Sequence, residues 1–328
     1  MKIRIISIMT TITVLLSVLL PLTGCAAKDG LQNVINTDDH TFTCTYKGVA
    51  HTCILDFPKG GEKPEGTGKA ADTKGAPLIV MLHGYAETPE GFRTKTKFHE
   101  AACPRGYVVA YVSGASDPND GTSAAGWNSG IGLPGKGKQT NRKDQENKGN
   151  TDETDGGNDD TGFLVALAEH LKKEYSLDRN RIYAVGFSNG AFMVHRLAME
   201  ANDTYHGFVS VAGMMPEKIW EERKDDLTVS FFQVTGEKDD LIPKNSDGSA
   251  KYAKAPAIEE VMAYYAAGLD HTETYEVGKS SLLTTYTDEK HDRRIWHLFI
   301  QDGRHSWPDE NITGIRFNDM ILDFFEAE

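Results

Sequence analysis

After residue 76 the chain alternates between short apolar runs and longer stretches with apolar residues at helical spacing. Each run ends near glycine, proline or charged residues, a pattern typical of strands that are buried on both faces. The runs predict strands at residues 77–84, 107–112, 181–186, 207–213, 228–236 and 294–300.

The stretches between these runs predict helices. In the clearest one, five apolar residues between 161 and 175 repeat at helical spacing. We expect helices at about 89–103, 161–175, 190–200, 256–267 and 312–327. Strands that alternate with helices indicate an α/β class with a mostly parallel sheet and helices on both faces. Ligands bind such sheets beyond the carboxyl ends of the strands.

The segment before residue 77 follows a different pattern. Residues 41–46 and 50–57 predict an N-terminal antiparallel hairpin, which would bring Cys44 and Cys53 close together. The sequence leaves open whether these cysteines form a disulfide or remain free in a packed strand pair. Residues 59–76 and 134–158 lack apolar periodicity, and we expect flexible loops there.

The first 24 residues resemble an export signal, with a positive start, an apolar run and small residues before Cys25. The sequence "LTGC" resembles a bacterial lipoprotein box, which would make Cys25 the lipidated first residue of the mature chain. A transmembrane anchor is the alternative. We therefore expect a signal peptide at 1–24, a tether at 25–40, a catalytic domain at 41–328 and an extracellular, surface-anchored protein. The formal charge of −13 argues against nucleic-acid binding.

The sequence "AVGFSNGAF" carries the clearest chemistry. Here a G-x-S-x-G pattern centred on Ser188 follows a predicted buried strand and opens a predicted helix. This is the setting that a nucleophilic serine needs, because the tight turn exposes its hydroxyl and the helix start favours an anion. The alternative is a tight turn without chemistry.

A serine hydroxyl needs a histidine to accept its proton and an acid to orient that histidine. After Ser188, "VTGEKDDLIP" offers Asp239 and Asp240, and "FIQDGRHSWP" offers His305, each just after a predicted strand. The residues alone do not decide between the two aspartates. Among the later histidines only His305 lies in a loop that follows a strand, so it is the expected base.

The oxyanion formed by attack needs two N–H donors. We expect one from the backbone of Asn189, which follows the nucleophile. The other should come from the turn "HGYAE", where Gly84 and Tyr85 follow a buried strand, and we choose Tyr85.

These motifs resemble the secreted polyhydroxybutyrate depolymerase and feruloyl or acetylxylan esterase family of the α/β-hydrolases. The resemblance covers roughly residues 41–325 and rests on "LIVMLHGY", "GWNSG", "DDTGFLVALAEHLKKEYSLDRNRIYAVGFSNGAFM", "VTGEKDDLIP" and "DGRHSWP". It implies that Asp239 is the triad acid and that Trp127 and Trp307 line a substrate cleft. Asp159 and Asp160 match the family's acidic pair, although we interpret them as a helix N-cap.

Together these features predict a serine carboxylester hydrolase with a Ser188–His305–Asp239 triad, no metal and no organic cofactor. The resemblance implies feruloyl or acetyl esters of plant polysaccharide, or short hydroxyalkanoate esters, as polymer-derived substrates. We expect contact with the membrane only through the lipid on Cys25. The alternatives are a serine peptidase on the same fold and a non-catalytic, glycan-binding surface lipoprotein.

Overall fold

The computed structural model describes residues 30–58, 73–116, 125–131, 158–244, 251, 254–288 and 293–327. Within these residues eleven strands form one sheet, in the order β1-β2-β3-β5-β4-β8-β9-β10-β13-β12-β11. A short ribbon, β6 with β7, forms a second sheet. The strands are β1 (Gln32–Asn36), β2 (Thr41–Tyr46), β3 (Val49–Asp56), β4 (Leu78–Leu82), β5 (Val108–Val112), β6 (Ala115–Ser116), β7 (Ala125–Gly126), β8 (Ile182–Phe187), β9 (Gly207–Val211), β10 (Phe231–Gly236), β11 (His271–Val277), β12 (Ser281–Thr287) and β13 (Arg294–Ile300).

The large sheet is mixed rather than mostly parallel, which corrects the predicted fold class. Only the central strands β5, β4, β8, β9, β10 and β13 pair in parallel. The predicted hairpin strands form β2 and β3, but they belong to an antiparallel edge of the same sheet, with β1 outside them and β5 inside. At the other edge, β13, β12 and β11 pair antiparallel.

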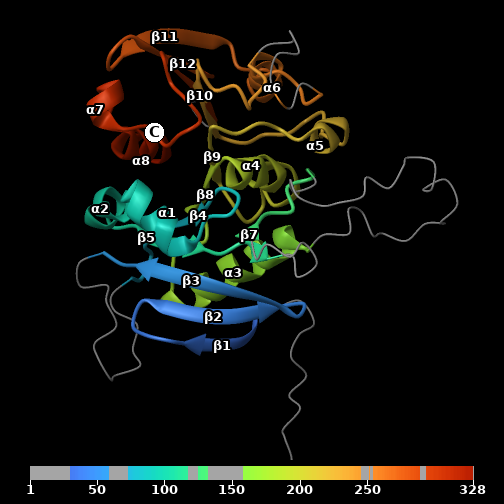
Figure 1. Ribbon diagram of the computed structural model, residues 1–328, viewed down its shortest axis with the longest axis vertical. Coiled ribbons are helices and arrows are strands. Elements are labelled where there is room, and N and C mark those ends of the chain that lie inside the picture. The colour runs from blue at the N-terminus through green and yellow to red at the C-terminus, as the bar shows by residue number, and fades with distance from the viewer. Residues whose placement is uncertain are drawn as a thin grey trace, which may run out of the picture.

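Helices cover both faces of the sheet, with α1, α2 and α8 on one side and α3 to α6 on the other (Figure 1). Alternate residues of β4 show why both faces are apolar. Leu78 and Val80 pack into the core under α3 and α4, while Ile79 and Met81 pack into the core under α1, α2 and α8. The helices are α1 (Pro89–Thr96), α2 (Phe98–Ala102), α3 (Asp160–Tyr175), α4 (Asn189–Glu200), α5 (Glu217–Glu221), α6 (Ile258–Tyr265), α7 (Glu310–Thr313) and α8 (Phe317–Glu326), with a 3₁₀ turn at Cys103–Arg105.

All six predicted buried strands are present, with ends shifted by a few residues. Two predicted helices are each divided in two. Lys97 has φ +48° and separates α1 from α2, and Gly314 has φ +71° and ends α7 before α8. A residue in the left-handed conformation cannot continue the right-handed helix, so each helix ends there.

The predicted signal peptide, Cys25, residues 59–72 and residues 134–157 lie outside the described residues. Cys44 and Cys53 are both buried free thiols, so in this structure they do not form the disulfide that the sequence left open. Burial raises the pKa of the Cys44 thiol to about 11. In the part of the chain that the structure describes, no helix has the length and apolar character needed to cross a membrane.

Candidate active site

Ser188 lies at the sharp turn between β8 and α4, with φ +53° and ψ −119°. Such a backbone is strained for a residue with a side chain, so the surroundings must hold it. Its N–H donates to the Val211 carbonyl of β9 at 3.0 Å. A Cβ on Gly186 would clash with the Gly190 carbonyl, and a Cβ on Gly190 would clash with the Leu82 carbonyl. Both glycines are therefore needed to let β8, α4 and β4 meet at the serine.

His305 joins Ser188 to Asp239 by two hydrogen bonds. Its Nε2 lies 2.8 Å from Ser188 Oγ, and its Nδ1 lies 2.8 Å from Asp239 Oδ2. A carboxylate can only accept, so Nδ1 carries the proton and Nε2 accepts from the serine hydroxyl. The other Asp239 oxygen accepts the Leu241 N–H at 3.0 Å. Asp239 is buried, whereas the imidazole remains about one-fifth exposed. The arrangement can pass the serine proton to the imidazole.

The loops after β10 and β13 bring the acid and the histidine together. The Glu237 N–H donates to the Ile300 carbonyl at 3.0 Å, and the Lys238 N–H donates to the Gly303 carbonyl at 2.7 Å. A Cβ on Gly236 would lie 2.6 Å from the Gly303 carbonyl oxygen, so this approach also depends on glycine. Because β10 and β13 are parallel neighbours, both loops leave the same edge of the sheet.

The turn after β4 is fixed by its own side chains. The buried His83 donates from Nδ1 to the Gly84 carbonyl at 2.7 Å, and its Nε2 accepts the Gly114 N–H at 2.9 Å. Burial lowers the pKa of His83, which favours this neutral ring. The Gly84 N–H donates to Glu87 Oε2 at 3.0 Å. The Gly84 amide is therefore engaged, and the amide of Tyr85 follows it directly.

Asn189 is the first residue of α4, where backbone N–H groups have no acceptor within the helix. Its buried side chain accepts the Trp127 N–H at 2.7 Å and donates to the Trp127 carbonyl at 3.2 Å. Trp127 is completely buried, and its indole N–H donates to the His83 carbonyl at 2.9 Å. The expected role of Trp127 in lining a substrate cleft is therefore wrong, because the indole fills space beneath the turn and offers no surface.

Trp307 is 9% exposed, and its indole N–H donates to Asn318 at 3.2 Å. It packs edge-on against Phe92 with ring centroids 5.6 Å apart. Together with Lys95 and Ser306, the residue that follows His305 in the sequence, it lines a cavity of about 700 Å³. Its contact with substrate stays a prediction.

His195 is buried in the core, and His297 is partly buried on β13. His195 is held by the Tyr265 hydroxyl at 3.0 Å and by Gln233 at 3.2 Å, and burial lowers its pKa to about 3. Burial likewise lowers the pKa of His297 to about 4. Both rings are bonded to neighbouring core groups and lie away from Ser188, whereas His305 contacts its hydroxyl.

The acidic pair at the start of α3 has two roles. Asp159 caps the helix by accepting the Gly162 N–H at 2.9 Å, which agrees with the N-cap interpretation. Asp160 is buried, and its Oδ2 accepts the Asn128 N–H at 2.6 Å. Its Oδ1 has no hydrogen-bond partner among the described residues. Burial raises the pKa of Asp160 to about 7.

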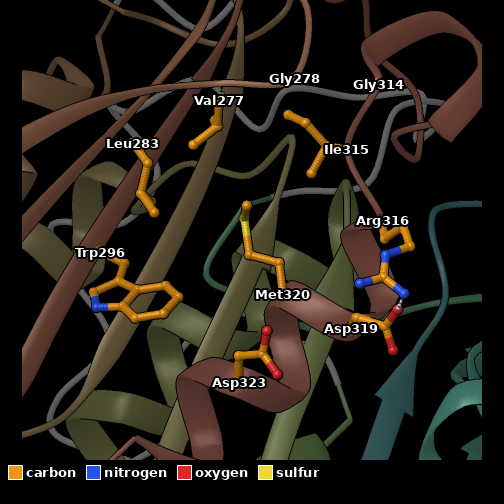
Figure 2. A pocket seen from close by; sticks show the side chains of 10 residues that line it. All are labelled: Val277, Gly278, Leu283, Trp296, Gly314, Ile315, Arg316, Asp319, Met320 and Asp323. Carbon is orange, nitrogen blue, oxygen red and sulfur yellow. Dashed lines mark ion pairs between the residues drawn. The ribbon is translucent and has the colours of Figure 1, made fainter.

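A second cavity, of about 350 Å³, lies between the β11–β13 edge and α8 (Figure 2). Trp296 and Met320 contribute to its apolar lining, and the ion pair between Arg316 and Asp319 lies at its side. None of its lining residues belongs to the Ser188 site.

The chain belongs to the serine hydrolase (FSH1) family, whose model matches residues 74–263. It is 26% identical over 261 residues to "Putative esterase NocK" of Nocardia uniformis subsp. tsuyamanensis, covering 74% of this chain and 68% of that protein. It is 23% identical over 167 residues to "Bifunctional acetylxylan esterase/xylanase XynS20E" of Neocallimastix patriciarum. That match covers 51% of this chain and only 20% of that protein.

Solved structures show the same fold at lower identity. An acetyl xylan esterase from Aspergillus awamori is 12% identical, with a TM-score of 0.51, over 90% of this chain and 99% of that chain. The native form of pOPH is 17% identical, with a TM-score of 0.57, over 89% and 88%. These findings confirm the resemblance to α/β-hydrolase esterases.

Sequence reasoning missed Glu87 and Lys95. Glu87 holds the Gly84 amide, and Lys95 binds the Glu87 carboxylate at 2.7 Å. The only signal in the sequence was the position of Glu87 at the end of "HGYAE", just before α1.

Proposed function

We propose that this serine hydrolase is an exported carboxylester hydrolase that works through an acyl-enzyme on Ser188. The observation that carries the proposal is the continuous hydrogen-bonded series from Ser188 Oγ through His305 to Asp239, with 2.8 Å at each link. The strained turn at Ser188 supports the same role, because strain of this kind is kept where function requires it.

In the acylation step, Ser188 Oγ attacks the ester carbonyl carbon while His305 Nε2 accepts the hydroxyl proton. Asp239 keeps the proton of the ring on Nδ1 and stabilises the imidazolium that forms. When the tetrahedral intermediate collapses, the imidazolium gives its proton to the leaving alkoxide and an alcohol departs. Water, activated by the same histidine, then releases the acid and restores the serine.

The negative charge on the tetrahedral intermediate requires donors that are already in place. We assign this role to the backbone N–H groups of Asn189 and Tyr85. The Gly84 N–H already donates to Glu87, which argues against Gly84 as the donor. The position of Asn189 at the start of α4 adds the positive end of a helix dipole.

The proposed substrates are acetyl or feruloyl esters of plant polysaccharide, or short hydroxyalkanoate esters. One relative and one fold neighbour are named as acetylxylan esterases, which supports acetyl esters of polysaccharide. The proposed export would bring the enzyme to polysaccharide outside the cell, which supports a polymer-derived substrate. The proposed route is a signal peptide at 1–24 followed by lipidation of Cys25 and surface anchoring. Incorporation of an alkyne fatty acid into wild type but not into Cys25→Ala would support the anchor.

Hydrolysis of 4-nitrophenyl acetate by wild type and Ser188→Ala tests the function, and a panel of acetyl, feruloyl and hydroxybutyrate esters then assigns the acyl group. We expect ester turnover by wild type and a loss of at least about 10⁴-fold in Ser188→Ala. Hydrolysis of peptide amides without ester turnover would instead favour a peptidase. Binding of glycans without any hydrolysis would favour the non-catalytic alternative.

A further inference from the structure

Two charged side chains outside the triad hold the turn that carries the proposed second oxyanion donor. Glu87 Oε2 accepts the Gly84 N–H at 3.0 Å, while the Glu87 N–H donates to the Gly84 carbonyl at 3.2 Å. Ala86, with φ +62°, donates its N–H to the Ala125 carbonyl at 2.8 Å. The Gly84–Tyr85 peptide is therefore held at its carbonyl by the Glu87 N–H and by His83 Nδ1, and the Tyr85–Ala86 peptide is held at its N–H by Ala125.

The second side chain, Lys95, reaches Glu87 from the last turn of α1. Its Nζ lies 2.7 Å from Glu87 Oε1 and 3.6 Å from the centre of the Phe187 ring. Phe187 directly precedes the nucleophile, and its ring centre lies 5.4 Å from that of His305. Lys95 thus connects the turn after β4 with the end of β8, and Phe187 in turn packs against His305.

We propose that Glu87 is a positioning residue of the oxyanion hole and that Lys95 neutralises the negative charge this positioning introduces. The inference rests on the proposed esterase function. Glu87 touches no reacting atom. Its carboxylate holds the Gly84 N–H and its own N–H holds the Gly84 carbonyl, which lies in the same peptide group as the Tyr85 N–H.

Neutralisation matters because a carboxylate close to the oxyanion opposes the charge of the transition state. Standard bond lengths place the Tyr85 nitrogen within about 7 Å of Glu87 Oε2, and hence the oxyanion within about 10 Å. At an effective dielectric constant of about 20, an unpaired charge at that distance slows the reaction about tenfold. Glu87 and Lys95 are each about one-third exposed, so their ion pair adds little to stability and variants should fold.

The experiment measures kcat and KM for 4-nitrophenyl acetate in Glu87→Ala, Glu87→Gln, Lys95→Met and the double variant Glu87→Gln/Lys95→Met. We expect Glu87→Ala to lose about tenfold or more in kcat, because the Gly84 N–H loses its acceptor. Glu87→Gln should stay within about threefold of wild type, because its amide oxygen can still accept. Lys95→Met should lose about tenfold, and the double variant should recover to the level of Glu87→Gln. KM should change by less than about twofold throughout.

Glu90→Gln and Lys173→Met are the matched controls, since they make the same charge changes at exposed positions, on α1 and α3 respectively. Equal kcat values in wild type, Glu87→Ala and Lys95→Met would overturn the inference while leaving the esterase function intact. A double variant no faster than Lys95→Met would overturn the neutralising role. An inactive wild type would refute both this inference and the proposed esterase function.

Discussion

Replacing Asp239 by asparagine changes one oxygen into an NH₂ group in a side chain that is only 1% exposed. The Leu241 N–H, 3.0 Å from Oδ1, requires an acceptor and therefore keeps the amide oxygen on its side. The NH₂ group must then face His305 Nδ1, 2.8 Å from the original Oδ2. A donor at that position makes Nδ1 an acceptor and moves the ring proton to Nε2, where it faces Ser188 and cannot take the hydroxyl proton.

Loss of the correct tautomer in a serine triad costs about 10⁴-fold in kcat, which corresponds to about 5 kcal/mol of transition-state stabilisation. We therefore expect Asp239→Asn to lose about 10⁴-fold in kcat for 4-nitrophenyl acetate while retaining its fold by circular dichroism. Asp240→Asn is the matched control and should stay within about twofold of wild type, because its side chain is exposed and outside the series. A loss of less than tenfold in Asp239→Asn would refute the reasoning.

Three further substitutions test the surroundings of the site. Gly190→Ala forces a backbone shift at the serine and should cost about 1–3 kcal/mol in urea unfolding as well as activity, whereas Gly30→Ala, in open space, should be neutral. Between about pH 4 and pH 7 the Asp160 carboxyl is protonated in the folded state and ionised in the unfolded chain. Stability should therefore fall by up to about 4 kcal/mol as pH rises through that window, and unfolding of Asp160→Asn at pH 5 and pH 8 should show a smaller fall. Trp127→Phe leaves the His83 carbonyl without its donor and should lower the free energy of unfolding by about 1–3 kcal/mol; an unchanged melting temperature would contradict the assigned support role.

The centre of the fold was predictable because its strands are buried on both faces. The run at 77–84 reads as continuously apolar, and β4 is indeed fully buried. The strand β11, with the sequence "HTETYEV", is almost wholly exposed, so no apolar pattern marked it. Because this strand escapes the apolar pattern, the sequence predicts a mostly parallel sheet where the structure has a mixed one. The helix break at Lys97 was equally hidden, since lysine rarely adopts a left-handed backbone.

Some residues of the candidate site were predictable from the sequence, and others were not. Ser188 and His305 follow strands, and the topology of a parallel sheet is enough to predict that they meet. The choice of Asp239 over Asp240 came only from the family resemblance, because it depends on how one tight turn is held by the Leu241 N–H. The prediction for Trp127 is wrong because nothing in the neighbouring sequence indicates that the indole lies inward, hydrogen-bonded to the His83 carbonyl.

The most direct test of the central claim is the mass of the protein after reaction with a fluorophosphonate, a reagent that labels activated serines. We predict a single adduct, mapped by peptide digestion to Ser188, and no adduct in His305→Ala, because an unassisted serine hydroxyl is a poor nucleophile. An adduct on another residue, or none on a protein that hydrolyses esters, would contradict the account.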